Sequence, residues 1–121
     1  MKQHVYADNK TLDVLIKIPL QEIVYIECME KKVMVHTSDD MHYLVDSSIR
    51  EMGEYLKPRG FVVPYRSYVV NCDYISYVDT GCLWLYVPYE RRTIEISVSE
   101  MRQQETEKIF EKHKQQCSMA V

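Results

Sequence analysis

The amino-acid sequence predicts a mainly β domain with one short amphipathic helix and a C-terminal helix. Over most of the first ninety-odd residues, apolar and β-branched side chains alternate with polar ones, which is the period of a half-buried strand. The period changes to that of a helix over residues 46–57, where the apolar residues fall on one stripe. A third pattern, rich in strong helix formers, covers residues 99–116.

Short polar segments of the kind that form turns separate the strand patterns. Ser38, Asp39 and Asp40 precede the pattern that starts at His42, so we expect a hairpin there. The segment Asp79–Gly81 separates two further patterns in the same way. We expect strands at residues 14–18, 23–28, 33–37, 42–45, 74–78, 83–87 and 93–98, with a strand-like stretch from Gly60 to Ile75.

The short helix has recognisable start and stop signals. Ser48, with Glu51 three residues later, predicts a capping box at the N-terminus of the helix. Pro58 and Gly60 are expected to end it, because proline cannot continue a helix and glycine tolerates the left-handed backbone that often follows one.

The C-terminal helix has less apolar surface with which to pack. Its candidate N-cap is Ser97 or Ser99, and its apolar positions are only Met101, Ile109 and Phe110. We therefore expect the first turn to be held on the sheet and residues 117–121 to be disordered.

Length and composition indicate one domain over residues 1–121. The chain has 121 residues and a mass of 14.4 kDa, without internal repeats or a linker-like segment. No apolar run reaches the roughly 18 residues of a membrane span, and the first ten residues lack the apolar core of a secretory signal. We expect a soluble, cytoplasmic protein.

The residue types argue against enzymatic and metal chemistry. The four cysteines are widely spaced, with no C-x-x-C and no histidine at zinc-site spacing, which predicts reduced thiols and no metal site. Three glycines are too few for a phosphate-binding loop, and none of the four histidines has a triad-like neighbour in the sequence. We expect no catalytic residue, no cofactor and no small-molecule substrate.

Two motifs, in this order, resemble the LytTR family of bacterial DNA-binding domains. The first is Glu22-Ile23 followed by Tyr25-Ile26-Glu27, and the second is Phe61 followed by Tyr65-Arg66-Ser67-Tyr68-Val69-Val70-Asn71. The resemblance covers about residues 14–102 and leaves 103–121 as a helical extension and flexible tail. It implies layered short antiparallel sheets and a transcription regulator that binds repeated promoter sites, commonly as the output domain of a two-component response regulator.

The resemblance also implies three regions of DNA contact. Arginine can pair with two acceptors of guanine, whereas lysine and serine are suited to phosphate oxygens. Arg66 lies in a segment, residues 57–72, that contains three basic residues and no acid. The implied contact residues are Lys31 and Lys32 in the first loop, Tyr65, Arg66 and Ser67 in the second motif, and Ser97, Ser99 and Arg102 before the last helix.

The sequence departs from the family pattern at two of these regions. Tyr65 stands where the family usually has histidine, and Glu100 stands where it often has a basic residue. Tyrosine can donate a hydrogen bond to phosphate but cannot become cationic, and a carboxylate is repelled by phosphate.

Each candidate also has a purely structural interpretation. Arg66 can cap a helix end or pair with a carboxylate, Lys31 and Lys32 can simply form a polar turn, and Asn71 can satisfy backbone groups. For the whole domain, the alternative to binding promoter DNA, alone or as a homodimer, is a protein-interaction module of the same fold that modulates a related regulator.

The positions of the cations separate these two functions. Convergence of Lys31, Lys32, Arg66 and Arg102 on one face favours DNA binding. Dispersal of these cations around Glu100 favours the interaction module.

Overall fold

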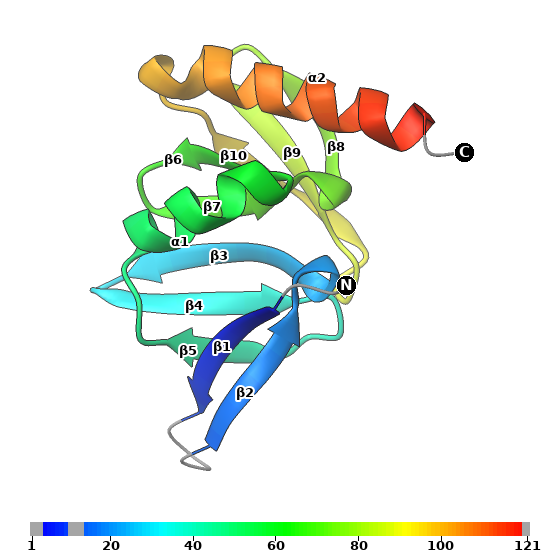
Figure 1. The fold of residues 1–121 in the computed structure, drawn as a ribbon. Helices are drawn as coiled ribbons and strands as arrows, with labels where there is room; N and C mark the ends of the chain where they lie inside the picture. The colour runs from blue at the N-terminus through cyan, green and yellow to red at the C-terminus, as the bar shows by residue number, and fades with distance from the viewer. Residues whose placement is uncertain (1–3, 10–13, 120–121) are drawn as a thin grey trace.

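The computed structural model describes residues 4–9 and 14–119 (Figure 1). Ten strands and two α-helices occur in this part of the chain, joined in places by short 3-10 turns. The strands are β1 (His4–Asn9), β2 (Val14–Pro19), β3 (Ile23–Met29), β4 (Lys32–Thr37), β5 (His42–Val45), β6 (Phe61–Tyr65), β7 (Tyr68–Asn71), β8 (Ile75–Asp79), β9 (Cys82–Val87) and β10 (Arg92–Ser97), and the helices are α1 (Ile49–Leu56) and α2 (Gln103–Met119).

The strands form three antiparallel sheets, which confirms the predicted mainly β fold. The central sheet has five strands in the order β5-β4-β3-β7-β6, the second has the order β10-β9-β8, and β1 pairs with β2. Tyr25 of β3 stands opposite Val70 of β7, so the two family-like motifs lie on neighbouring strands of one sheet. Figure 1 shows α1 lying across one face of this sheet and α2 crossing above the second sheet.

Two apolar clusters cover the opposite faces of the central sheet. On one face, Ile26 and Val35 are buried with Met52 and Leu56 of α1. The cluster of the other face is Val24, Val62 and Val70 of the central sheet with Leu83, Leu85 and Ile96 of the second sheet and Phe110 of α2. Each buried aliphatic side chain stabilises the fold by about 1.5–3 kcal/mol, so α1 and α2 are fixed to the sheets mainly by these contacts.

The predicted boundary signals around α1 are present. The Ser48 hydroxyl accepts a hydrogen bond of 3.0 Å from the Glu51 backbone N–H, which is one of the two hydrogen bonds of a capping box. After a 3-10 turn, η2 (Lys57–Arg59), Gly60 adopts a left-handed backbone with φ of 88°, a conformation that side chains disfavour.

Asn71 satisfies backbone groups, as its structural interpretation predicted. Its amide nitrogen donates to the carbonyls of Leu20 and Ile23 at 3.3 and 2.8 Å, and its side-chain oxygen accepts from the Asp73 N–H at 3.0 Å. This buried side chain therefore fixes the 3-10 turn η3 (Cys72–Tyr74) between β7 and β8.

The C-terminal helix differs from its prediction in three respects. A 3-10 turn, η4 (Glu100–Arg102), precedes α2, and Ser99 is the N-cap residue of that turn without a side-chain cap bond. This turn changes the phase of the helix, so Met101 is 93% exposed while Thr106 and Phe110 are buried. The helix continues to Met119, through three of the five residues expected to be disordered, and residues 120–121 lie outside the described residues.

One strand has no counterpart in the prediction. The segment of β1 was not expected to form a strand, and it pairs with β2 from His4↔Pro19 to Asn9↔Val14. In the part of the chain that the structure describes, no helix is both long and apolar enough to cross a membrane.

Candidate nucleic-acid interface

Lys31 lies at the tip of the β3–β4 hairpin. Met29 pairs with Lys32, which leaves Glu30 and Lys31 as a two-residue turn. Both turn residues have a left-handed backbone, with φ of 51° and 67°, which is the geometry of a type I′ turn and is more often occupied by asparagine and glycine. Lys31 and Lys32 are exposed, and neither forms an ion pair with another described residue.

Arg66 lies at the tip of a second hairpin, between β6 and β7. Tyr65 pairs with Tyr68, so Arg66 and Ser67 form its turn. The Ser67 carbonyl accepts a hydrogen bond of 2.9 Å from the Cys28 N–H of β3, which ties the turn to the central sheet. Arg66 is exposed, and no described carboxylate lies within ion-pair distance of its guanidinium. The structural alternative of an internal ion pair therefore does not hold for Arg66.

Both hairpin tips lie at the same end of the central sheet (Figure 1). Since β3 pairs antiparallel with both β4 and β7, its end at Met29 lies beside both turns. The α1 helix starts at this end as well, because β5 ends at Val45 opposite Val33. Strand pairing therefore brings together segments that are more than thirty residues apart in the sequence.

Arg66 and Arg102 line one hollow of about 460 Å³ between α1, the β6–β7 hairpin and the start of α2. Two further cations of this hollow are paired: Lys57 with Glu105 at 3.0 Å, and Arg50 with Glu54 at 3.4 Å. No ion pair or side-chain hydrogen bond joins Arg66 or Arg102 to another of the described residues. Two guanidinium groups therefore remain available to an anion in the same hollow.

The two lysines line a neighbouring hollow of about 810 Å³. It is bounded by the β3–β4 tip, the end of β5 and the first turn of α1, and Ile49 lines both this hollow and the one that contains Arg66. Asp46 and Glu51 also line it, so its charge is mixed. Because Lys31 and Lys32 are exposed, their side chains can extend away from these acids. Their ammonium groups are suited to contact phosphates.

Tyr65, Ser67 and Ser97 line a third hollow, of about 360 Å³. Ser97 ends β10 beside the β6–β7 hairpin, and Glu95 of the same strand also lines the hollow. Sequence-predicted residues from two of the three contact regions thus meet here, although the Glu95 carboxylate repels phosphate.

Ser99 is placed differently from the other predicted contact residues. Its N–H donates to the Pro64 carbonyl at 2.8 Å, and its carbonyl accepts from the Arg102 N–H at 2.9 Å. Its hydroxyl is buried and has no hydrogen-bond partner among the described residues. Ser99 therefore holds the link between β10 and η4 against β6, because this tight connection turns its side chain inward.

Glu100 does not lie among the cations. It is exposed in η4 and lines none of the three hollows described above. Arg102, two residues later, lines the hollow of Arg66. Arg66 and Arg102 therefore line one hollow and the two lysines line the adjoining one, while Glu100 lines neither.

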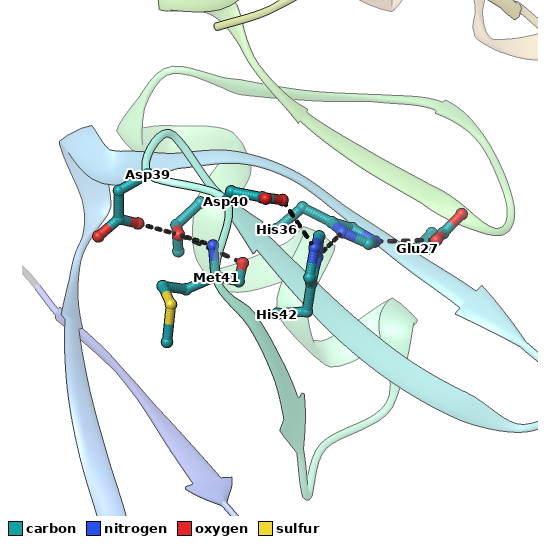
Figure 2. Close-up of polar contacts among 7 residues, drawn as sticks. Glu27, His36, Asp39, Asp40, Met41 and His42 are labelled. Atoms are coloured by element: carbon teal, nitrogen blue, oxygen red, sulfur yellow. Dashed lines mark hydrogen bonds and ion pairs between the residues drawn. The ribbon is translucent and has the colours of Figure 1, made fainter. Parts of the chain in front are cut away.

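Sequence reasoning missed a polar cluster toward the other end of β4 (Figure 2). His36 contacts Glu27 through Nε2 at 2.8 Å and His42 through Nδ1 at 2.6 Å, and His42 contacts Asp40 at 3.1 Å. Tyr25 stacks on the His36 ring at 4.3 Å. Burial is the main reason that the pKa of His36 is lowered, and the nearby His42 lowers it further.

Among the other cations of the hollow that contains Arg66, sequence reasoning missed Arg50, and it counted Lys57 only as a member of the basic segment 57–72. Arg50 lies in α1, and Lys57 caps the end of that helix and begins η2. The sequence pattern that could have identified them is the polar stripe of the predicted amphipathic helix, because that stripe has to face away from the core.

Comparisons with known proteins identify the family and the fold of the chain. The model of the LytTr DNA-binding domain family matches residues 13–114. Among solved structures, the LytTr DNA-binding domain of a Bacillus cereus protein, assigned as a methyl-accepting/DNA response regulator, is similar with a TM-score of 0.70 at 20% identity, over 90% of this chain and 97% of that one. No curated protein matches the chain. The match over most of the sequence shows that the chain belongs to the LytTR family of DNA-binding domains.

Proposed function

We propose that this domain binds double-stranded promoter DNA sequence-specifically as the DNA-binding part of a bacterial transcription regulator. The observation that carries the proposal is the pair Arg66 and Arg102, which come from separate elements and line one hollow without carboxylate partners. A protein keeps two such guanidinium groups together at the surface at the cost of their mutual repulsion, and a bound polyanion removes that cost.

Arg66 is the residue proposed to contact a base. It stands at the tip of a narrow two-residue turn, and a hairpin of two strands fits the major groove of B-DNA. A guanidinium there can donate to O6 and N7 of one guanine. Arg102 flanks it, at a position from which it contacts either the neighbouring base or its phosphate.

Lys31 and Lys32 are proposed to contact phosphates. A lysine ammonium acts as a point charge and fixes the position of the protein on the duplex without reading its sequence. Lys31 occupies a turn position where asparagine or glycine would be less strained. A need for a long cationic side chain at this tip would explain the strained backbone. Tyr65, Ser67 and Ser97 are proposed as additional donors to phosphate.

The net charge of −3 limits the non-specific part of the affinity. Few phosphate contacts give modest binding by one domain, and affinity rises steeply when two linked or dimeric copies bind adjacent sites. We therefore propose that the DNA target carries repeated sites. A titration of a single-site duplex and a repeated-site duplex tests this, since cooperative filling is expected only for the repeat.

Selection of bound duplexes from random DNA tests the proposed function. At low and at moderate salt, the domain is expected to enrich one common motif, with weaker recovery at the higher salt. Recovery without a common motif at either salt would contradict sequence-specific binding. Absence of any recovery at low salt would favour the interaction module instead.

A further inference from the structure

Three side chains with metal-binding atoms meet where α2 crosses η3. His113 and Cys117 are one helical turn apart on α2, and Asp73 lies in η3. His113 Nε2 is 2.6 Å from Asp73 Oδ1 and 3.5 Å from Cys117 Sγ. All three candidate ligand atoms lie within 4.8 Å of one another, and no second group of this kind occurs among the described residues.

The donor set selects a class of metal. An imidazole nitrogen, a thiolate sulfur and one carboxylate oxygen suit zinc and similar divalent transition metals, whereas magnesium and calcium prefer oxygen ligands alone. Three protein ligands leave one position of a tetrahedron for water. Cys117 is an exposed free thiol, so an ion can reach it from solvent.

The distances agree with a tetrahedral ion along one edge. Zinc bonds of about 2.0–2.1 Å to nitrogen and 2.3 Å to sulfur place those two ligand atoms about 3.5–3.6 Å apart, and the Sγ–Nε2 distance is 3.5 Å. The corresponding nitrogen–oxygen edge is about 3.3–3.4 Å, so the present 2.6 Å hydrogen bond between His113 and Asp73 has to lengthen when an ion enters.

The protein holds the His113 ring and the backbone of Asp73 in position by independent contacts. The His113 ring packs on Gly60, where an added Cβ would lie only 3.3 Å from Nδ1 and 3.4 Å from Cε1. Asp73 is fixed through its backbone N–H, which donates to Asn71. Because Cys117 Sγ already lies 3.5 Å from His113 Nε2, the exposed Asp73 carboxylate is the group that has to move when an ion enters.

We propose that Asp73, His113 and Cys117 form a binding site for one zinc-class divalent ion. Binding replaces the hydrogen bond between His113 and Asp73 with two bonds to the metal, and it requires His113 Nε2 without a proton and Cys117 as the thiolate. The ion therefore links α2 to the β7–β8 connection, and its affinity falls as pH falls because protons compete for both ligands.

Calorimetric titration of the reduced, metal-free protein with zinc tests the site. One equivalent is expected to bind, and Cys117→Ser, which changes an exposed side chain, should weaken binding at least 10-fold. Cys82→Ser is the matched control, since Cys82 is a partly exposed free thiol that contacts Glu95 and does not belong to the cluster of Asp73, His113 and Cys117. Equal affinity for zinc in the two serine variants, or no binding by the wild type, would overturn the proposal.

Cobalt substitution gives a second readout that does not depend on affinity. A thiolate–cobalt charge-transfer band and tetrahedral visible absorption are expected for the wild type and for Cys82→Ser. Neither is expected for Cys117→Ser, and Asp73→Asn should keep the charge-transfer band with an altered visible spectrum. A charge-transfer band that persists in Cys117→Ser would show that another thiol binds the metal, which would contradict the assignment.

Discussion

The Nδ1 atoms of His36 and His42 lie 2.6 Å apart, so one of them carries a proton and the other accepts it. His36 Nε2 faces the Glu27 carboxylate and His42 Nε2 faces the Asp40 carboxylate (Figure 2). A carboxylate can only accept, so both Nε2 atoms act as donors. All three contacts are satisfied when the two Nδ1 atoms share one proton. A proton on each Nδ1 would place two N–H groups against each other.

The first prediction concerns the dependence of stability on pH. Burial lowers the pKa of His36 in the folded protein below the ordinary value of about 6.5, so the unfolded chain binds the proton more tightly. The free energy of unfolding should therefore fall as pH decreases below about 6.5 and level off below the pKa of folded His36. Urea unfolding of the wild type and of His36→Gln between pH 8 and pH 5 measures this difference.

The His36→Gln variant should lose less stability than the wild type over the same pH interval. Groups that do not contact His36 contribute equally in both proteins, so the difference between the two slopes reports on His36 together with its partners Glu27 and His42. Parallel slopes would mean that His36 titrates alike in the folded and unfolded chains.

The second prediction concerns base recognition by Arg66. Arg66→Ala should weaken binding to the selected duplex by about 1–3 kcal/mol and relax the preference at one base position. Arg91→Ala is the matched control, because Arg91 is also an exposed arginine in a hairpin turn, β9–β10, at the other end of β10 from Ser97. Competition titrations with single-base variants of the duplex measure both effects. An equal loss on all duplexes would make Arg66 a phosphate contact.

The third prediction concerns the salt dependence of binding. Each phosphate contact changes the slope of log Kobs against log salt by about −0.9. Lys31→Ala and Lys32→Ala should each make the slope shallower by about 1 while leaving the preferred sequence unchanged. Lys112→Ala removes the same charge from the exposed part of α2 and should leave the slope as it is. A change of sequence preference in either hairpin variant would contradict a pure phosphate role.

Local patterns predicted most strands because alternation and turn residues act over a few residues. The segment that forms β1 contains His4, Asp8 and Asn9, so its alternation is weak and its pairing with β2 determines its structure. The meeting of Arg66 with Arg102 depends on strand pairing across the sheets, which no short pattern contains. The same holds for Asp73 and His113, which are 40 residues apart. The four-residue spacing of His113 and Cys117 on a helix was a signal in the sequence, and the expectation of no metal site overlooked it.

The start of α2 shows why the apolar stripe of a helix was only partly predictable. A regular helix from Ser99 would place Met101 near the sheet, but the 3-10 turn η4 has fewer residues per turn and shifts the following positions around the axis. Thr106 and Phe110, four residues apart, consequently form the buried face. Composition could not reveal this shift, because the hydrogen bonds of Ser99 to Pro64 and Arg102 impose it.

The fourth prediction tests how α2 is attached to the sheets. Phe110 is 6% exposed and belongs to the cluster that includes Leu83 and Leu85. Phe110→Ala should lower the free energy of unfolding by about 3–5 kcal/mol, since it removes a large side chain and leaves a cavity. Met101→Ala, at a site that is 93% exposed, should change it by less than about 0.5 kcal/mol. Chemical denaturation of both variants measures the contrast, and comparable losses would mean that α2 packs through its first turn instead.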